Sequence, residues 1–337
     1  MEKWFTREWQ QNSLWQIVLR PLSWLFALLV ALRRFLYRAG IFSIHPAGVP
    51  VIVVGNIVVG GTGKTPLVIA LAKHLQQAGY SPGVVSRGFG ADDTNLADEP
   101  QLIRHRLNIP VVSEKNRPAA ARALCAAYPQ VDVILSDDGL QHYALGRDIE
   151  IAVVDARRGF GNGASLPAGP LREPIGRLAH VDAIVLNKDK EGDDRNDLVT
   201  LLNKLGPPVF CMQLANESFV SLAQGQKIGI EQFVNETAGK HLVAIAGIAD
   251  PPRFFAHLAC LGIACQSTHV FPDHYLYRAQ DLAFPKAEVI LMTEKDAVKC
   301  LPCTDNRLWA MHIDAILPDE LVQWALTRLT DINARKT

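Results

Sequence analysis

A glycine-rich segment between a predicted strand and a predicted helix has the residue types of a phosphate-binding loop. It follows the β-branched run Val51–Val54 and precedes a helical pattern over Pro66–Gly79. Glycines let backbone N–H groups turn toward a phosphate, and the N-terminus of the following helix adds a favourable dipole. The lysine and threonine that end the segment would bind the terminal phosphates and Mg²⁺. The predicted cofactor-binding residues are Gly60, Gly61, Thr62, Gly63, Lys64 and Thr65.

Two details bear on which ligand this loop binds. Val58 stands where the strict phosphate-loop pattern has a glycine, so a merely structural glycine turn is the alternative. The intact core over residues 60–65, in its strand–loop–helix context, favours nucleotide phosphate. Neither residues 187–190 nor residues 293–296 spell the Asn-Lys-x-Asp of guanine-specific sites. ATP is therefore the predicted nucleotide.

Two adjacent carboxylates, Asp137 and Asp138, follow the apolar run Val131–Ser136. In phosphate-loop proteins an acid at the carboxyl end of a neighbouring strand holds Mg²⁺, often through water. The sequence Asp-Asp-Gly is also typical of a surface turn. Its position directly after a predicted strand favours the metal site.

Further charged residues lie outside the predicted strands. Acidic residues occur in two predicted loops, 97–100 and 169–174, where a solvated turn is the alternative. Arg87 follows another predicted strand and could contact an anionic ligand. His274 stands beside Asp273. A histidine paired with an aspartate can adjust it as a general base, although a lone histidine is more often structural.

Strands and helices alternate from residue 41 onward, which predicts a mostly parallel sheet covered by helices on both faces. We expect a phosphate-loop-type α/β/α sandwich over residues 41–210, a linker or hinge over 211–240, and a smaller α/β/α lobe over 241–337. The predicted strands are Val51–Val54, Gly83–Ser86, Val131–Ser136, Ile149–Val154, Ala183–Leu186, Val209–Met212, Leu242–Ala246, Glu288–Met292 and Leu308–His312. The other predicted helices are Arg117–Ala127, Pro251–Leu261 and one that begins at Pro318.

Residues 1–40 are basic and apolar, with six basic and two acidic side chains. The uninterrupted apolar run, Pro21–Leu32, would span about 18 Å as a helix, against a hydrocarbon core of about 30 Å. With tryptophans as anchors, the segment is predicted to be a helix in the membrane interface. A full membrane span and a helix packed on its own domain are the alternatives. Glu2 and Glu8 argue against a secretory signal.

Composition excludes several classes of protein. The chain has 337 residues with 34 Lys+Arg and 34 Asp+Glu, so the formal net charge is zero and a nucleic-acid partner is not expected. A hydrophobic content of 49% indicates a globular protein. Six cysteines in a chain of this length do not indicate a disulfide framework, and a cytosolic, reducing environment fits them best. Cys300 and Cys303 have CxxC spacing without a second closely spaced pair, so ordinary thiols are favoured over a zinc site.

Taken in order, these segments resemble the tetraacyldisaccharide 4′-kinase family, the lipid A 4′-kinases of Gram-negative bacteria. The resemblance extends from about residue 50 to residue 300 and includes the valine at position 58. Each segment alone is a weak signal, whereas the set is highly specific. The matching segments are VGNIVVGGTGKTP (54–66), SRGFG (86–90), DEP (98–100), DDGLQH (137–142), LPAGPLREP (166–174), FPDHY (271–275) and TEKDAVK (293–299).

The resemblance implies an enzyme that uses ATP and Mg²⁺ to phosphorylate the 4′-hydroxyl of a tetraacyldisaccharide 1-phosphate, which gives lipid IVA in lipid A biosynthesis. It implies two α/β/α lobes that close on the nucleotide. It also implies peripheral attachment to the cytoplasmic face of the bacterial inner membrane, where the lipid substrate resides. We expect a monomer.

The resemblance also implies roles for individual residues. Asp98 matches the catalytic base of the family, with His274 as its partner, and Lys64 completes the catalytic set. Arg172 is expected close to the nucleotide phosphates. The expected metal-binding residues are Thr65, Asp137, Asp138 and Glu173.

Two other functions fit the same residues. A phosphate-loop kinase or ATPase of a soluble small molecule would use the same loop, and its N-terminal helix would serve only for packing. A non-enzymatic nucleotide switch at the membrane would bind nucleotide without phosphoryl transfer. That switch would give Asp98 and His274 no role.

Overall fold

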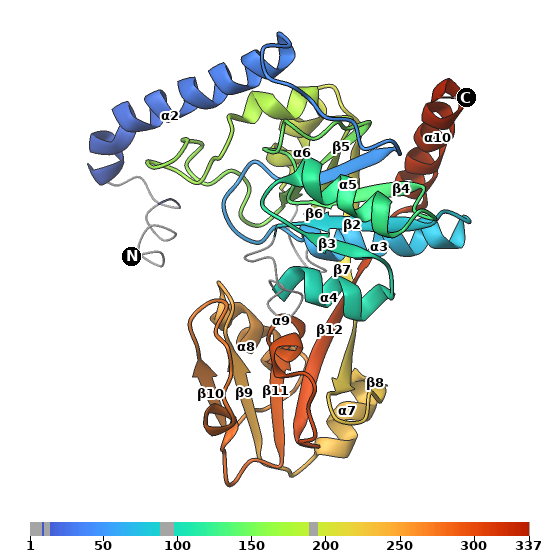
Figure 1. Ribbon diagram of the computed structural model, residues 1–337. Helices are drawn as coiled ribbons and strands as arrows, with labels where there is room; N and C mark the ends of the chain where they lie inside the picture. Colours follow the sequence, from blue (N-terminus) through green and yellow to red (C-terminus); the bar gives the residue numbers. More distant parts are fainter. Residues whose placement is uncertain (1–8, 10–13, 88–97, 189–194, 337) are drawn as a thin grey trace. The chain divides into compact units, whose positions relative to one another are not determined.

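The contacts in the computed structural model divide the chain into two compact units (Figure 1). The structure describes residues 9, 14–87, 98–188 and 195–336. The first unit comprises Met1–Asn95, Leu107–Leu214 and Ala315–Thr337, and the second comprises Leu96–Arg106 and Ala215–Asp314.

The first unit is built on a parallel sheet in the order β3-β2-β4-β1-β5-β6-β7. Its central strands are runs of valine, isoleucine and leucine that are buried on both faces, as expected for a parallel sheet covered by helices. This finding confirms the predicted α/β class. The strands are β1 (Val51–Gly55), β2 (Pro82–Ser86), β3 (Val111–Ser113), β4 (Val133–Asp137), β5 (Ile149–Asp155), β6 (Ala183–Lys188) and β7 (Val209–Ser221).

Helices with apolar faces complete the first unit. In α5, Asn116 is the N-cap and accepts a 3.1 Å hydrogen bond from the backbone N–H of Ala119, while Pro118 occupies the first turn. The C-terminal helix α10 buries Leu321, Ala325 and Leu329 and packs against α3. The helices are α2 (Leu14–Arg38), α3 (Lys64–Gln77), α5 (Arg117–Ala127), η2 (Ile175–His180), α6 (Asn196–Asn203) and α10 (Asp319–Lys336).

The second unit has its own parallel strands in the order β10-β9-β11-β12, which can be followed in Figure 1. β7 ends in this unit and pairs antiparallel with β8. The strands are β8 (Lys227–Gly229), β9 (Leu242–Ala246), β10 (Ser267–Val270), β11 (Val289–Thr293) and β12 (Leu308–Ile316). The helices are α4 (Asp98–Leu107), α7 (Ile230–Thr237), α8 (Pro251–Cys260), η3 (Ala279–Leu282), α9 (Glu294–Ala297) and η4 (Val298–Cys300).

The observed units differ from the expected boundaries in three segments. Residues 96–106 belong to the second unit, and the C-terminal helix belongs to the first. Residues 211–240, expected to be a linker, instead contain β8, α7 and the end of β7. The reason is a buried aromatic pair, because Phe219 and Phe233 from this segment stack with ring centroids 3.9 Å apart in the core of the second unit. A locally polar composition hid this contribution to the core.

The N-terminal helix α2 buries polar residues and exposes apolar ones. Ser23 is 4% exposed and its hydroxyl accepts a 2.9 Å hydrogen bond from the backbone N–H of Ala168. On the outer face, Trp24 is 70% exposed and Leu28 is 64% exposed. The helix continues through Pro21, so it is longer than the uninterrupted apolar run Pro21–Leu32. By length and composition it is apolar enough to cross a membrane.

A buried ion pair ties η2 to β5 in the first unit. Arg177, at 2% exposure, donates from Nη2 to both carboxylate oxygens of Glu150 at 2.7 and 2.8 Å. Arg147 Nη1 adds a 2.7 Å contact. Burial acts to raise the pKa of Glu150, but the two arginines outweigh burial and hold that pKa below its ordinary value.

Glu150→Gln is expected to lower the free energy of unfolding at neutral pH by about 3 kcal/mol, because the buried Arg177 charge loses its closest carboxylate and keeps the longer 3.5 Å contact with Glu173. The pKa of Glu150 is lower in the folded state than its unfolded-state value of 4.5, so its ion pair stabilises the fold at pH values above 4.5. This stabilisation is lost as the pH falls through the folded-state pKa. The difference between the two proteins should therefore shrink in acid. Urea unfolding at pH 7 and about pH 3.5 measures it. Equal differences at both pH values would contradict this prediction, and Asp197→Asn, in an exposed ion pair with Arg195, is the matched control.

Candidate active site

The phosphate loop, residues 55–65, runs from the end of β1 into the first turn of α3. Gly63 is the N-cap of α3 and has a left-handed backbone with φ +92°. A Cβ at this position would lie 2.7 Å from Asn187 Nδ2 and 2.8 Å from Met212 Cε. Both the backbone conformation and the close approach therefore require glycine here.

Side-chain amides hold the loop by its carbonyl groups. Asn56 Nδ2 donates to the Gly60 carbonyl at 3.3 Å and to Thr62 Oγ1 at 3.1 Å. Asn187 Nδ2 donates to the Thr62 carbonyl at 3.2 Å. In the part of the chain that the structure describes, no side chain caps the N-terminus of α3, so its first backbone N–H groups are available to an anion.

Two cations converge on Asp138, which follows β4. Lys64 Nζ lies 3.5 Å from Asp138 Oδ1, and Arg172 Nη1 donates to both carboxylate oxygens at 2.9 and 3.1 Å. Burial acts to raise the pKa of Asp138, but Lys64 and Arg172 together lower it below its ordinary value. The ionised Asp138 therefore balances two cations that are placed beside the phosphate loop.

Asp137 ends β4 and is 1% exposed. Thr65 Oγ1 donates to its Oδ2 at 3.3 Å, and Arg117 Nη2 donates to its backbone carbonyl at 3.0 Å. A hydroxyl and a carboxylate at the start of the helix are the hard oxygen ligands that Mg²⁺ prefers. Within the described ranges there is no cluster of three acidic, histidine or cysteine side chains suited to a metal. Mg²⁺ commonly keeps several waters and uses only one or two protein ligands, so the donor pair fits this ion.

Glu173, at 1% exposure, lies in a network of its own. Its carboxylate accepts hydrogen bonds from Gln141 Nε2 at 2.7 Å and from the Tyr143 hydroxyl, and it pairs with Arg177 Nε at 3.5 Å. Burial, followed by the nearby Glu173 charge, raises the pKa of Tyr143 to about 12, so its hydroxyl stays a donor. Gln141 also donates to the Asn56 carbonyl at 3.0 Å, which connects this network to the phosphate loop.

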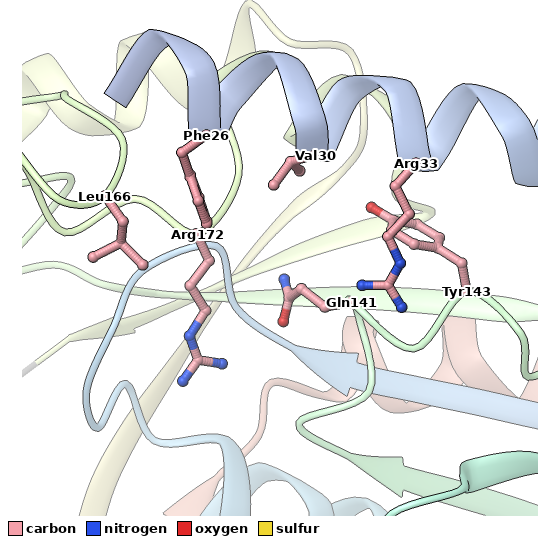
Figure 2. Close-up of a pocket in the computed structure, with 7 residues that line it drawn as sticks. All are labelled: Phe26, Val30, Arg33, Gln141, Tyr143, Leu166 and Arg172. Carbon is pink, nitrogen blue, oxygen red and sulfur yellow. The ribbon is translucent and has the colours of Figure 1, made fainter. Parts of the chain in front are cut away.

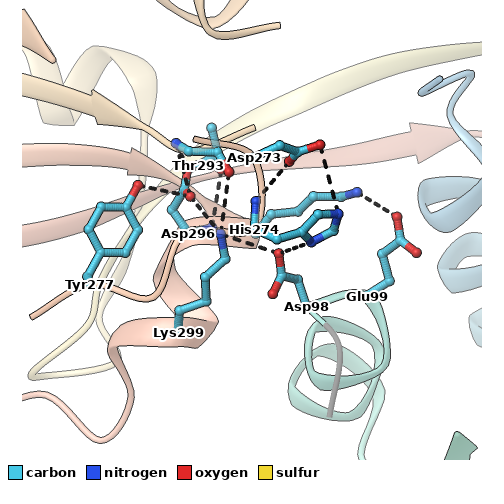
Figure 3. A network of polar contacts seen from close by, with 10 residues as sticks. Asp98, Glu99, Asp273, His274, Tyr277, Thr293, Asp296 and Lys299 are labelled. Carbon is cyan, nitrogen blue, oxygen red and sulfur yellow. Dashed lines mark hydrogen bonds and ion pairs between the residues drawn. The ribbon is translucent and has the colours of Figure 1, made fainter. Parts of the chain in front are cut away.

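In the second unit, Asp98 begins α4 and is 8% exposed. The prediction of a loop at residues 97–100 is wrong from Asp98 onward, where the helix α4 begins. A proline is tolerated in the first turn of a helix, and carboxylates are favourable at a helix N-terminus. His274 Nδ1 lies 2.9 Å from Asp98 Oδ2 (Figure 3). His274 itself has a left-handed backbone with φ +60°. The structure thus brings the expected base and its expected partner into contact.

Lys299, which no sequence pattern had indicated as a site residue, also contacts Asp98. Lys299 Nζ lies 3.3 Å from Asp98 Oδ2, and its side chain is 2% exposed. Lys299 belongs to the TEKDAVK segment, which was the only available signal. Arg87 is described and exposed, whereas residues 88–90 of the SRGFG segment lie outside the described residues.

A pocket of about 340 Å³ in the first unit lies beside α2. Phe26, Val30 and Arg33 reach into it from the helix, as Figure 2 shows. Gln141, Tyr143, Leu166 and Arg172 form the rest of its lining. Arg172 thus contributes both to this pocket and to the charge cluster at Asp138.

Relatives named as tetraacyldisaccharide 4′-kinases match nearly the whole chain. The tetraacyldisaccharide 4′-kinase of Methylobacillus flagellatus is 43% identical over 343 residues, which cover 97% of this chain and 96% of that protein. The tetraacyldisaccharide 4′-kinase of Hahella chejuensis is 42% identical over 357 residues, which cover 100% of this chain and 99% of that protein.

A solved structure and a family model agree with these relatives. The crystal structure of LpxK from Aquifex aeolicus in complex with ATP matches 94% of this chain and 100% of its own, with a TM-score of 0.76 and 26% sequence identity. The model of the tetraacyldisaccharide-1-P 4′-kinase (LpxK) family matches residues 15–330. With a phosphate loop, an Asp–His pair and full-length relatives in agreement, the chain belongs to the tetraacyldisaccharide 4′-kinase family.

Proposed function

We propose that this protein transfers the γ-phosphate of ATP to the 4′-hydroxyl of a tetraacyldisaccharide 1-phosphate, which forms lipid IVA in lipid A biosynthesis. The observation that carries the proposal is the phosphate loop, where Gly63 opens α3 without a side-chain cap and Lys64 stands beside it. The ATP bound to the Aquifex aeolicus relative supports ATP as the nucleotide.

The loop and its cations would bind the triphosphate. Backbone N–H groups over residues 60–65 would donate to phosphate oxygens, and Lys64 would exchange its contact with Asp138 for the terminal phosphates. Arg172, also paired with Asp138, would neutralise charge that develops on the transferred group. Thr65 and Asp137 would hold Mg²⁺, with Asp138 and Glu173 as the further acids expected around it. When bound, Mg²⁺ supplies charge neutralisation at the phosphates.

A sugar hydroxyl is a weak nucleophile, so its proton must be accepted as the new bond forms. Asp98 is the base in this proposal, because it is a carboxylate whose orientation is fixed by a short contact with His274. His274 would keep Asp98 in that orientation. The pair would then deliver an activated oxygen to the phosphorus.

The lipid substrate would be met at the membrane. Moving acyl chains into water costs about 0.8 kcal/mol per CH₂, so an enzyme that acts on a four-chain lipid must work at the bilayer surface. The exposed apolar face of α2 supports such attachment, because an apolar face of this size is stable only against another apolar phase. We place the helix in the interface on the cytoplasmic side of the inner membrane, with the pocket beside Phe26 and Val30 facing the lipid.

The activity is tested with γ-labelled ATP and tetraacyldisaccharide 1-phosphate in mixed micelles. The expected result is a labelled lipid that comigrates with lipid IVA and carries its new phosphate at the 4′ position. Label that stays in ATP, or that appears only as inorganic phosphate, would contradict the proposal. Label on a soluble acceptor alone would favour the small-molecule kinase instead.

Asp98→Ala is expected to lower kcat by about 10²–10⁴-fold, because proton acceptance is lost, while the KM for ATP stays close to that of the wild type. Steady-state kinetics with the micellar substrate measures both constants. Glu99→Ala is the matched control, because Glu99 is the neighbouring carboxylate on α4 and pairs with the partly exposed Lys295. An unchanged kcat in Asp98→Ala would remove Asp98 from the mechanism.

Replacing Leu25, Leu28 and Leu29 together by glutamine should weaken binding to anionic vesicles by at least about tenfold, since each leucine loses its apolar contact with the bilayer. All three side chains are at least half exposed, so the fold should persist. Vesicle sedimentation measures the binding. Leu201→Gln, at an exposed leucine on α6, should bind as the wild type does. Equal vesicle binding by the triple variant and the wild type would refute attachment through this face.

A further inference from the structure

A buried ammonium lies behind the Asp98–His274 pair in the second unit. Lys299 is on η4, and its three N–H donors face three acceptors. These acceptors are Asp296 Oδ1 at 3.0 Å, Asp98 Oδ2 at 3.3 Å and the Gly247 carbonyl at 3.4 Å. The ring of Tyr277 lies 5.7 Å from the same nitrogen. Because every donor has an acceptor, the position of the ammonium is determined from several sides.

Asp296 fixes the far end of this arrangement. It is fully buried, and its carboxylate accepts hydrogen bonds from Thr293 Oγ1 at 2.7 Å, from the Tyr277 hydroxyl at 3.0 Å and from the Gly247 N–H at 3.2 Å. Thr293 ends β11 and caps α9, while Gly247 directly follows β9, which pairs with β11. The carboxylate is therefore tied to the carboxyl ends of two paired strands.

The two donors to Asp98 differ in their surroundings. His274 has a side chain that is 61% exposed, whereas Lys299 is buried, and both contact the same oxygen, Oδ2. Among the described residues, no hydrogen bond or ion pair occupies Oδ1 of Asp98. Two donors on one oxygen orient the carboxylate. Its second oxygen is left to accept a hydrogen bond from the substrate hydroxyl that receives the phosphate. Lys299 is the donor that Asp296 ties to the carboxyl ends of β9 and β11 (Figure 3).

We propose that Lys299, anchored by Asp296, is a positioning residue that fixes the carboxylate of Asp98 for proton acceptance. This inference rests on the proposed function, in which Asp98 is the base. In the second unit, four residues then act together as a chain of contacts, His274–Asp98–Lys299–Asp296. The contacts of Lys299 with Asp98 and with Asp296 transmit the rigidity of the sheet to the reacting carboxylate. Misplacing a catalytic group by about 1 Å can reduce a rate by about 10²-fold, so loss of this anchor should have a measurable effect on kcat.

The test is a double-mutant cycle between Lys299→Met and Asp98→Asn, with kcat and the KM for ATP measured for every variant. Lys299→Met keeps an unbranched buried side chain that is one atom shorter and removes its charge. Alone it should lower kcat by about 10–100-fold with the KM for ATP within about twofold of the wild type. In the Asp98→Asn background it should lower kcat by less than about threefold further, because the residue acts through Asp98.

Asp296→Asn provides a second variant that preserves shape if Lys299→Met fails to fold. It should lower kcat in the same direction and show the same loss of effect in the Asp98→Asn background. Lys295→Met is the matched control, because Lys295 lies on α9 and pairs with Glu99 of α4 at 2.7 Å rather than with Asp98. It should keep the kcat of the wild type.

The outcomes separate this inference from the proposed function. If Asp98→Asn retains full activity, the assignment of the base fails. If Asp98→Asn is impaired while Lys299→Met and Asp296→Asn are both fully active, the positioning role alone is refuted. Losses that multiply fully in the double variant would also overturn it, because they would show that Lys299 does not act through Asp98.

Discussion

The structure of the nucleotide site depends on one close approach, that of the backbone at Gly63 to the side chain of Asn187. This contact requires a left-handed glycine, turns the loop carbonyls toward amide donors, and leaves the start of α3 open to an anion. Asn187 lies near the end of β6, and Asp137 ends β4 beside the strand that feeds the loop. The polar groups of the site therefore come from the carboxyl ends of parallel strands, where ligands of open α/β sheets generally bind.

Both candidate sites place carboxylates directly beside cations at positions that are largely shielded from water. In the first unit Asp138 is balanced by a lysine and an arginine, and in the second Asp296 and Asp98 share the ammonium of Lys299. Unpaired buried charges are strongly destabilising, so each carboxylate is held in one geometry by its cation. Glu173 is held by hydrogen bonds from Gln141 and Tyr143 and by an ion pair with an arginine. The contacts between carboxylates and cations that stabilise the fold therefore also orient the side chains proposed to take part in catalysis.

Much of this arrangement could be predicted from sequence, because local patterns carry it. The β-branched runs predicted the strands that surround the phosphate loop, and the motif around Lys64 predicted its ligand class. Contacts between distant segments could not be read in this way. Asp98 and Lys299 are 201 positions apart, and no local pattern indicates that the short helix α4 folds with the second unit. The same limit hid the aromatic pair of Phe219 and Phe233, since the segment between them is polar.

The triphosphate of ATP is expected to bind on the loop around Gly63. A crystal structure with Mg²⁺ and a non-hydrolysable ATP analogue tests this most directly. We expect phosphate oxygens within hydrogen-bond distance of the backbone N–H groups of residues 60–65, with Lys64 moved from Asp138 to the terminal phosphate. A triphosphate bound elsewhere, with the pair between Lys64 and Asp138 intact, would contradict it.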